Sequence, residues 1–579
     1  KDLTLWVARM GLRDPIGAGR KSVLKNLLIT ILLAFEFDLE WLVNTFCMLH
    51  EGERELCEQF WDGDAIEKIL ADHILIPAFD RLLSDPLPLL RVLGALAEGP
   101  TAGWYCLNFT LHASTMPRAP PILTTMLSRL QTNVASQAEA EAALVLLERL
   151  LQGGEHLTRQ VCGLLTQPSP AATPSTQPLG LAASAACTVL GITCACTDLP
   201  SLHLTALCLR IMARLAGRAP NEALSQLGST PLLALVPGSS WGDMLAVKSG
   251  SHVGFAEGGC MPKLEQLLQS GECPAGVYSA TLALLDLVAS LVKRGVRQLI
   301  VSSLLAHVLW KVLVPQARWR YRNRLHRWQL CAATLRLLGA VLAQPEDSLV
   351  EGVRASLSND EGCASAVLAP LALDASTIDQ LWRQSGGSCD ARVEVAALEE
   401  AILASVEVVG KLLAPSLATV AGARPPARAP TALQRALFSA PVGGRFTPVA
   451  SLASFTAYKF GPRIHCAAIK TLALLCSSAA SLLPRPLPIT TCLPNLTHSL
   501  PTVRSSMAQG PSEEPASDAA ARAALVDLLA PGRARSQPRE FCAVAELLLT
   551  AVRCQPDLAE LLFFNSEDAP QMAAPANPL

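Results

Sequence analysis

Aromatic and charged side chains are both scarce in this chain of 579 residues. Aromatic residues make up 5% of the sequence and charged residues 17%, whereas hydrophobic residues make up 50%. That apolar content is too high for a disordered chain. Strand-rich proteins depend on β-branched and aromatic residues, but the apolar residues here are mostly Leu, Ala and Val. The composition therefore favours helices.

The sequence also lacks a basic excess and the usual metal-ligand spacings. Its formal net charge is −2, which argues against a general nucleic-acid-binding protein but allows a local basic patch. The 18 cysteines are scattered without a C-x-x-C pair, and no histidine has a spacing such as H-E-x-x-H. We therefore expect reduced, buried thiols in a cytosolic or nuclear protein that has no metal site and no cofactor.

Long apolar runs are few. Leu27–Phe35 is only about half as long as a bilayer-spanning helix. Residues 179–197 are uncharged and long enough, but they are mostly Ala, Ser, Thr, Gly and Cys, which contribute little to membrane insertion. We predict a buried small-residue helix there and no transmembrane segment.

What the sequence does contain is a recurring helical phrase, in which apolar residues are spaced three and four apart. The clearest copies are Leu90–Ala97 (LRVLGALA) and Leu335–Leu342 (LRLLGAVL). Similar phrases occur at Leu147–Leu151, Leu209–Ala216, Leu285–Lys293, Val406–Leu413, Ile469–Cys476 and Val544–Val552. Each phrase puts a wide apolar stripe on one face of a helix, which a single repeat cannot bury alone.

The phrases recur at irregular intervals of roughly 50 to 75 residues, wider than the usual HEAT or armadillo repeat. We predict an all-α protein, an α-solenoid superhelix of irregular HEAT- or armadillo-like repeats that is continuous over residues 1–579. Pro-rich flexible loops are expected near 165–178, 414–432, 509–519 and 530–539, with a disordered tail at 566–579. Because Lys1 opens in the middle of an apolar helical pattern, we expect a fragment of a longer chain.

Two short motifs resemble sites of chemistry. Gly238–Gly242 (GSSWG) matches G-x-S-x-G, in which Ser240 would be a hydrolase nucleophile. That fold needs a strand before the serine and a helix after it, whereas we expect a glycine-rich loop over Gly250–Gly259 and no strand series. Gly17–Ser22 resembles a phosphate-binding loop, but Arg20 stands where the motif requires glycine. We therefore predict that the protein is not an enzyme, with a serine hydrolase as the remote alternative.

The densest chemical cluster spans Trp310–Trp328. It interleaves basic residues with aromatic ones: Lys311, Arg318, Arg320, Arg322, Arg324 and Arg327 with Trp319, Tyr321 and Trp328. Three interpretations stay open. The aromatics pack between repeats while the arginines pair with neighbouring acids, or the cluster grips an acidic segment of a protein partner, or it binds RNA or phospholipid. We select Trp319, Tyr321 and Arg322 as candidate partner-binding residues, because aromatic and arginine side chains often dominate binding energy.

Several separate stretches resemble one known family when they are taken in order. They are Phe60-Trp61, Leu89–Gly99, Tyr105–Leu107, Gly276–Lys293, Trp319–Tyr321, Ser376–Trp382 and Gln555–Leu562. Together they are similar to the nucleoporin 188 family, large α-solenoid scaffold proteins of the inner ring of the nuclear pore, whose sister family is the nucleoporin 205 or 192 type. The similarity runs through most of the chain but is low between these stretches.

The resemblance implies a structural subunit of the nuclear pore complex, located in the nuclear envelope and supporting transport of proteins and mRNA. It implies capture of short helical segments from linker nucleoporins, notably the nucleoporin 93 type, with no small-molecule substrate and no direct nucleic acid. The family carries a small SH3-like β insertion, expected near Met116–Ile122, where only proline-rich residues occur. The alternative is a HEAT-repeat transport receptor or cytosolic adaptor; such receptors usually have a strongly acidic surface.

Overall fold

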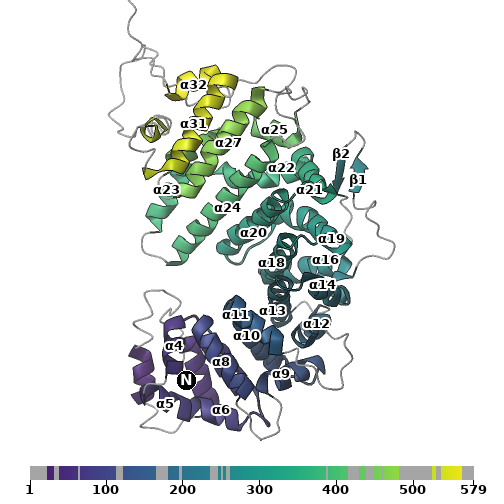
Figure 1. Ribbon diagram of the computed structural model, residues 1–579, viewed down its shortest axis with the longest axis vertical. Helices are drawn as coiled ribbons and strands as arrows, with labels where there is room; N and C mark the ends of the chain where they lie inside the picture. The colour runs from purple at the N-terminus through teal and green to yellow at the C-terminus, as the bar shows by residue number, and fades with distance from the viewer. Residues whose placement is uncertain are drawn as a thin grey trace, which may run out of the picture. The chain divides into compact units, whose positions relative to one another are not determined.

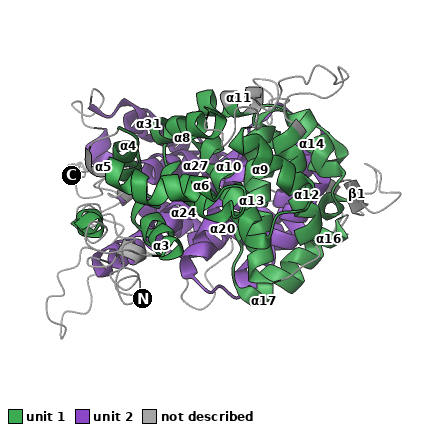
Figure 2. Cartoon of the chain, turned by 90° about the horizontal axis from the view of Figure 1, so that it is seen from below, with its two compact units in different colours: residues 1–238, 260–301 green, residues 239–259, 302–579 purple. Residues whose placement is uncertain are grey.

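The protein is described from a computed structural model. The structure describes residues 23–30, 38–62, 65–112, 121–164, 180–194, 198–234, 245–248, 252–255, 261–385, 389–414, 430–438, 447–458, 461–480, 525–529 and 536–563. These residues are almost entirely helical, which confirms the all-α prediction. They belong to two compact units, unit 1 (residues 1–238 and 260–301) and unit 2 (residues 239–259 and 302–579), which Figure 2 colours separately. Continuity over residues 1–579 stays a prediction.

The recurring phrases of unit 1 each form one helix of a row. The row consists of α7 (Leu87–Leu96), α10 (Gln137–Gln152), α13 (Leu199–Ala216) and α18 (Ser279–Lys293). Each helix of the row packs against the next, and α3 (Leu39–His50) packs on α7. The apolar stripe of one helix is therefore covered by its neighbours in the row.

Further helices flank the row of unit 1. α4 (Arg54–Asp62) and α11 (Glu155–Leu164) pack on α8 (Pro100–His112). α9 (Ile122–Gln131) packs on α12 (Gly180–Thr193), and α12 packs on α13. The shorter elements are α5 (Ala65–Leu70), α6 (Ile76–Asp80), α14 (Pro220–Gly228), η3 (Pro231–Leu233), α16 (Pro262–Gln266) and α17 (Cys273–Ala275). The predicted small-residue helix corresponds to α12, where Ala182, Ala183 and Ala186 are buried.

Unit 2 repeats the arrangement with the remaining phrases. Its row consists of α20 (Arg324–Leu342), α24 (Cys389–Leu413), α27 (Pro462–Ala480) and α31 (Pro538–Cys554), and consecutive members pack side by side (Figure 1). The other elements are α21 (Ser348–Asn359), α22 (Glu361–Leu368), η7 (Ala369–Ala372), α23 (Ala375–Gln384), α25 (Ala432–Leu437), α26 (Pro448–Ser454), η8 (Phe455–Ala457) and α32 (Pro556–Phe563). α19 (Leu299–His307) contains the boundary between the two units.

A two-stranded antiparallel hairpin overlaps Gly250–Gly259, where we expected a glycine-rich loop, so the loop was wrong for the residues of β2. β1 (Leu245–Lys248) lies just before that stretch and pairs with β2 (His252–Phe255), with Leu245 opposite Phe255, and β2 lies against α21. The sequence carries a signal for it, because large apolar residues occur at every second position of both strands and the three-residue connection contains Gly250. In the described part of the chain this sheet has two strands, fewer than a hydrolase sheet needs.

Three wide π-helical turns occur among the described residues, and each ends two residues before a proline. η2 (Ala71–Leu75) precedes Pro77, η4 (Leu267–Glu272) precedes Pro274, and η5 (Val308–Leu313) precedes Pro315. A proline ring in a helix clashes with the carbonyl group four residues earlier, and in all three cases that carbonyl belongs to the wide turn. After η2 and η4 the helix continues past the proline as α6 and α17, whereas after η5 it ends in a turn at Val314-Pro315.

Most of the predicted loops, namely 165–178, 509–519 and the tail at 566–579, lie outside the described residues, as do Gly17–Ser22 and all but the end of the stretch near Met116–Ile122. The other two loops were predicted too long at their C-terminal ends. α25 begins at Ala432, inside the predicted loop 414–432, because Thr431 and Gln434 form a reciprocal capping box. α31 begins at Pro538, inside the predicted loop 530–539, with the proline at a first-turn position that helices favour.

Two helical stretches, Leu199–Ala216 and Leu299–Arg318, are long and apolar enough to cross a membrane by length and composition. Their apolar windows are 72% and 67% buried inside the protein, and the core helix of a globular protein meets the same criteria.

Candidate functional site

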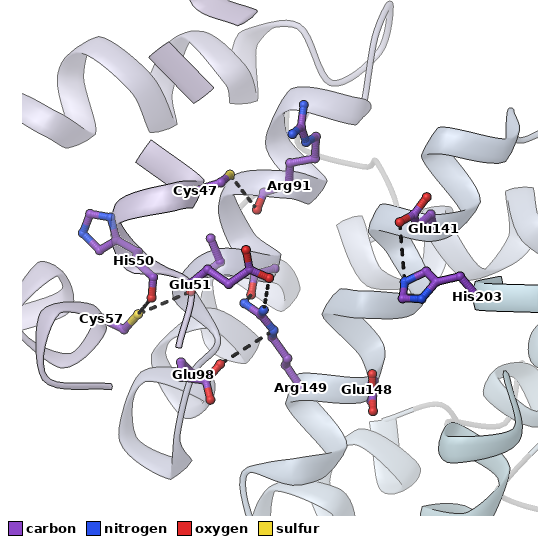
Figure 3. A network of polar contacts seen from close by, with 12 residues as sticks. Cys47, His50, Glu51, Cys57, Arg91, Glu98, Glu141, Glu148, Arg149 and His203 are labelled. Carbon is purple, nitrogen blue, oxygen red and sulfur yellow. Dashed lines mark hydrogen bonds and ion pairs between the residues drawn. The ribbon is translucent and has the colours of Figure 1, made fainter. Parts of the chain in front are cut away.

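Arginine side chains in unit 1 connect neighbouring helices of the row. Arg149 on α10 donates to the carbonyl oxygen of Gly94 on α7 (2.7 Å) and to the carboxylate of Glu51, which follows α3 (3.1 Å). The carboxylate of Glu98 lies 3.7 Å away, and Figure 3 shows Arg149 between these acceptors. The Arg149 side chain is only 15% exposed. It therefore connects α10 to α7 and to the C-terminal end of α3.

Other basic side chains connect neighbouring helices in the rows of both units. Arg210 on α13 pairs with the buried carboxylate of Glu148 on α10 at 2.5 Å. In unit 2, Arg336 on α20 pairs with Glu400 on α24, and the ammonium group of Lys411 on α24 donates to the carbonyl oxygen of Gly339 on α20 at 2.7 Å. Each of these basic side chains forms a contact between neighbouring helices.

The predicted site segment follows η5 in unit 2. After η6 (Gln316–Arg318) a short non-helical segment leads to α20, which begins at Arg324, and the backbone at Trp319 and at Asn323 is extended. Exposure alternates here: Trp319 and Tyr321 are half-buried, whereas Arg318, Arg320 and Arg322 are exposed. The arginines therefore meet the solvent, and the aromatic residues between them are partly covered. We call the five exposed arginines Arg318, Arg320, Arg322, Arg324 and Arg327 the arginine ridge.

Local contacts hold the aromatic residues of this segment in place. The Tyr321 hydroxyl donates to the carbonyl oxygen of Gln316 at 2.9 Å. The Asn323 side chain accepts from the Leu325 backbone N–H at 2.9 Å and caps α20. The Arg327 guanidinium lies 4.8 Å from the centre of the Trp328 ring, which is a cation–π contact. The aromatic residues and the cap therefore fix the position from which the arginines project.

Four of the five arginines in the arginine ridge have no acidic partner among the described residues. Across the described residues, Arg318, Arg322, Arg324 and Arg327 form no ion pair with an acidic side chain. The interpretation in which the cluster's arginines pair with neighbouring acids is therefore not supported for these four, in contrast to Arg149, Arg210 and Arg336.

The structure places the three predicted site residues on one segment, but they differ in exposure. Arg322 is exposed, whereas Trp319 and Tyr321 are half-buried. Their role in binding a partner stays a prediction. Arg318 and Arg324 were not among the residues predicted to bind a partner, although the alternation of arginine with aromatic residues before α20 is a sequence signal for both.

Several cysteine thiols of the described residues are buried and poorly reactive. The cysteines there are free, and burial raises the pKa of the Cys57 and Cys331 thiols to about 12, so both are protonated at neutral pH. Among the described residues, no group of three His, Cys, Asp or Glu side chains could hold a metal ion. Ser240 lies outside the described residues.

Comparisons with known proteins assign no family. No family model matches the chain, and no curated protein is significantly similar to it.

Proposed function

We propose that the protein is an α-solenoid scaffold of irregular HEAT-like repeats that works by binding other proteins. The proposal rests on the match between the recurring sequence phrases and the helices of the two rows. Every recurring phrase lies in a helix of one of the two rows, and consecutive phrase helices within each unit pack on one another. A solenoid is the architecture in which each repeat buries its apolar stripe only against the repeats next to it.

Such an architecture offers grooves between neighbouring helices to partner segments. A partner helix lays its apolar face into a groove, and charged residues at the rim set its orientation. Both rows of helices are held together by contacts of basic side chains, such as those of Arg149 and Arg210, which keep neighbouring helices in register. A scaffold needs this property, because it must present its surface before a partner arrives.

We further propose a place for this scaffold in the inner ring of the nuclear pore complex. Support comes from the ordered stretches that resemble the nucleoporin 188 family, from Phe60-Trp61 to Gln555–Leu562. Linker nucleoporins of the nucleoporin 93 type are then the proposed partners, and the nuclear envelope is the proposed location. A HEAT-repeat transport receptor is the second candidate, and the near-neutral net charge of −2 favours the scaffold over it.

Crosslinking mass spectrometry on isolated nuclear pores tests the proposed place. We expect crosslinks from lysines of this chain, such as Lys263 and Lys311, to inner-ring subunits, and no retention of the chain on GTP-loaded Ran. Absence from purified pores together with retention on GTP-loaded Ran would instead identify a transport receptor.

The hydrolase alternative has its own test at Ser240. We expect a broad serine-directed fluorophosphonate probe to label the wild-type chain no more than the Ser240→Ala variant, because a two-stranded hairpin follows the motif where a hydrolase needs a helix. Labelling that is present in the wild type and lost in the variant would overturn the proposal of a non-enzymatic scaffold.

A further inference from the structure

We propose that the arginine ridge is a binding site for an acidic peptide segment of a protein partner. The proposal rests on the protein-binding function above and deepens it by naming the chemistry of one partner. Arg318, Arg322 and Arg324 are its principal contacts, because all three are exposed and none forms an ion pair in the described part of the chain.

The first argument is uncompensated charge. Arg149, Arg210 and Arg336 each pair with an acid on or next to a neighbouring helix. Arg318, Arg322 and Arg324 are close together in the sequence and form no ion pair in the described part of the chain. The first turn of α20 contains no acidic residue and begins with Arg324, although the positive end of the helix dipole favours acids there. A segment that breaks such a local preference, and has no contact within the protein to offset it, is often part of a functional surface.

The second argument is the geometry of the arginines. Alternate residues of an extended chain lie about 7 Å apart on one face. Carboxylates on alternate residues of an extended peptide, or one turn apart on a helix, have a similar spacing. Each guanidinium can hold a carboxylate through two parallel N–H···O bonds, which an ammonium group cannot do. Arg320 and Arg322, two residues apart between η6 and α20, can therefore each hold one carboxylate of an acidic segment, with Arg318 and Arg324 on either side of them.

The third argument favours an acidic peptide over RNA and over a membrane surface as the partner. Single-stranded RNA binds through base stacking on exposed aromatic faces, but Trp319 and Tyr321 are half-buried and the Trp328 ring is covered by Arg327. A membrane surface is usually bound by basic residues together with exposed apolar ones. The large exposed hydrophobic residues of the described chain all lie outside Trp310–Trp328.

Fluorescence anisotropy on the full chain tests the proposal with a labelled deca-glutamate peptide at low salt. We expect the wild type to bind it and the triple variant Arg318→Glu, Arg322→Glu, Arg324→Glu to bind it about tenfold more weakly. The matched control is Arg383→Glu, Arg539→Glu, Arg553→Glu, which reverses three other exposed arginines of unit 2 and changes the net charge equally. This control should stay within about twofold of the wild type.

Equal losses in the two triple variants, or no loss in the ridge variant, would overturn the proposal. A labelled decauridylate RNA, or vesicles containing phosphatidylserine, that bound more tightly than the peptide and depended on the same arginines would assign the ridge to that ligand instead. If charge reversal lowers the helical circular dichroism, the Arg→Gln triple variant replaces it. A ridge variant that still crosslinks to inner-ring subunits leaves the scaffold function intact, so failure of one proposal is distinguishable from failure of the other.

Discussion

Replacing Arg149 by methionine will weaken the packing of α7 on α10 by about 2–3 kcal/mol. Methionine keeps the apolar stem but removes the bond to the Gly94 carbonyl oxygen at 2.7 Å, and a hydrogen bond from a charged group contributes about 1.5–3 kcal/mol. The contacts to Glu51 and Glu98 add less, because these carboxylates are 67% and 33% exposed and water screens them.

Hydrogen exchange detected by mass spectrometry is the suitable measurement, because a chain with two compact units need not unfold in one step. We expect protection in Leu87–Leu96 and Gln137–Gln152 to fall about fiftyfold, with unit 2 unchanged. The control is Arg159→Met, because Arg159 is 67% exposed and pairs only along the surface of α11 with Glu155. If both variants exchange alike, Arg149 does not lock the row.

The stability of unit 1 will fall as the pH rises from 4.5 to about 7, because of Glu272. This residue ends η4 and is fully buried beneath the start of α18, where its carboxyl group accepts from the Ala280 N–H at 2.7 Å and the Thr281 N–H at 3.2 Å. Burial raises the pKa of the Glu272 carboxyl from 4.5 to about 7, despite these hydrogen bonds, which act in the opposite direction.

The direction of the effect follows from proton binding. Below pH 4.5 both the folded and the unfolded states carry the proton, so the contribution of Glu272 is fully present. Between pH 4.5 and about 7 the unfolded state loses its proton while the folded state keeps it, and the free energy of unfolding falls by about 3 kcal/mol. Above about pH 7 both states are ionised and the loss is complete.

Two substitutions separate charge from hydrogen bonding at Glu272. Glu272→Gln keeps the acceptor and abolishes the pH dependence, so we expect protection of α18 at about pH 8 to exceed the wild type after correction for intrinsic exchange. Glu272→Ala leaves the Ala280 and Thr281 N–H groups without their carboxyl acceptor and costs about 2–4 kcal/mol even at low pH. Glu155→Gln, at a carboxyl that is 80% exposed, is the control. The same pH profile in wild type and Glu272→Gln would contradict the assignment.

The helices were predictable from the sequence because their cause is local. Each recurring phrase, such as Leu90–Ala97 in α7 or Leu335–Leu342 in α20, carries the three-and-four spacing that makes a buried helical stripe. The hairpin of β1 and β2 was missed, because two four-residue strands around Gly250 give a much weaker periodic signal than a helix of three or more turns.

The candidate site was predictable in position but not in orientation. Interleaved arginine and aromatic residues identify Trp310–Trp328 from sequence alone. Whether an arginine meets an acid is decided by tertiary packing, so Arg149 and Arg322 look alike in the sequence and differ in the fold. The same holds for Glu272, whose partners Ala280 and Thr281 become its neighbours only because η4 and α18 meet there.

The wide turn η5 also has a consequence for the ancestry of the chain. A π turn holds one more residue than an α turn, and one residue corresponds to about 100° of rotation around a helix. A single-codon insertion would leave this footprint, with the bulge absorbing the extra residue so that the layers on either side keep their alignment. Deleting one residue between Val308 and Leu313 would then restore an ordinary turn and leave the orientation of Pro315 unchanged, whereas the same deletion in a regular helix would rotate all that follows by that angle.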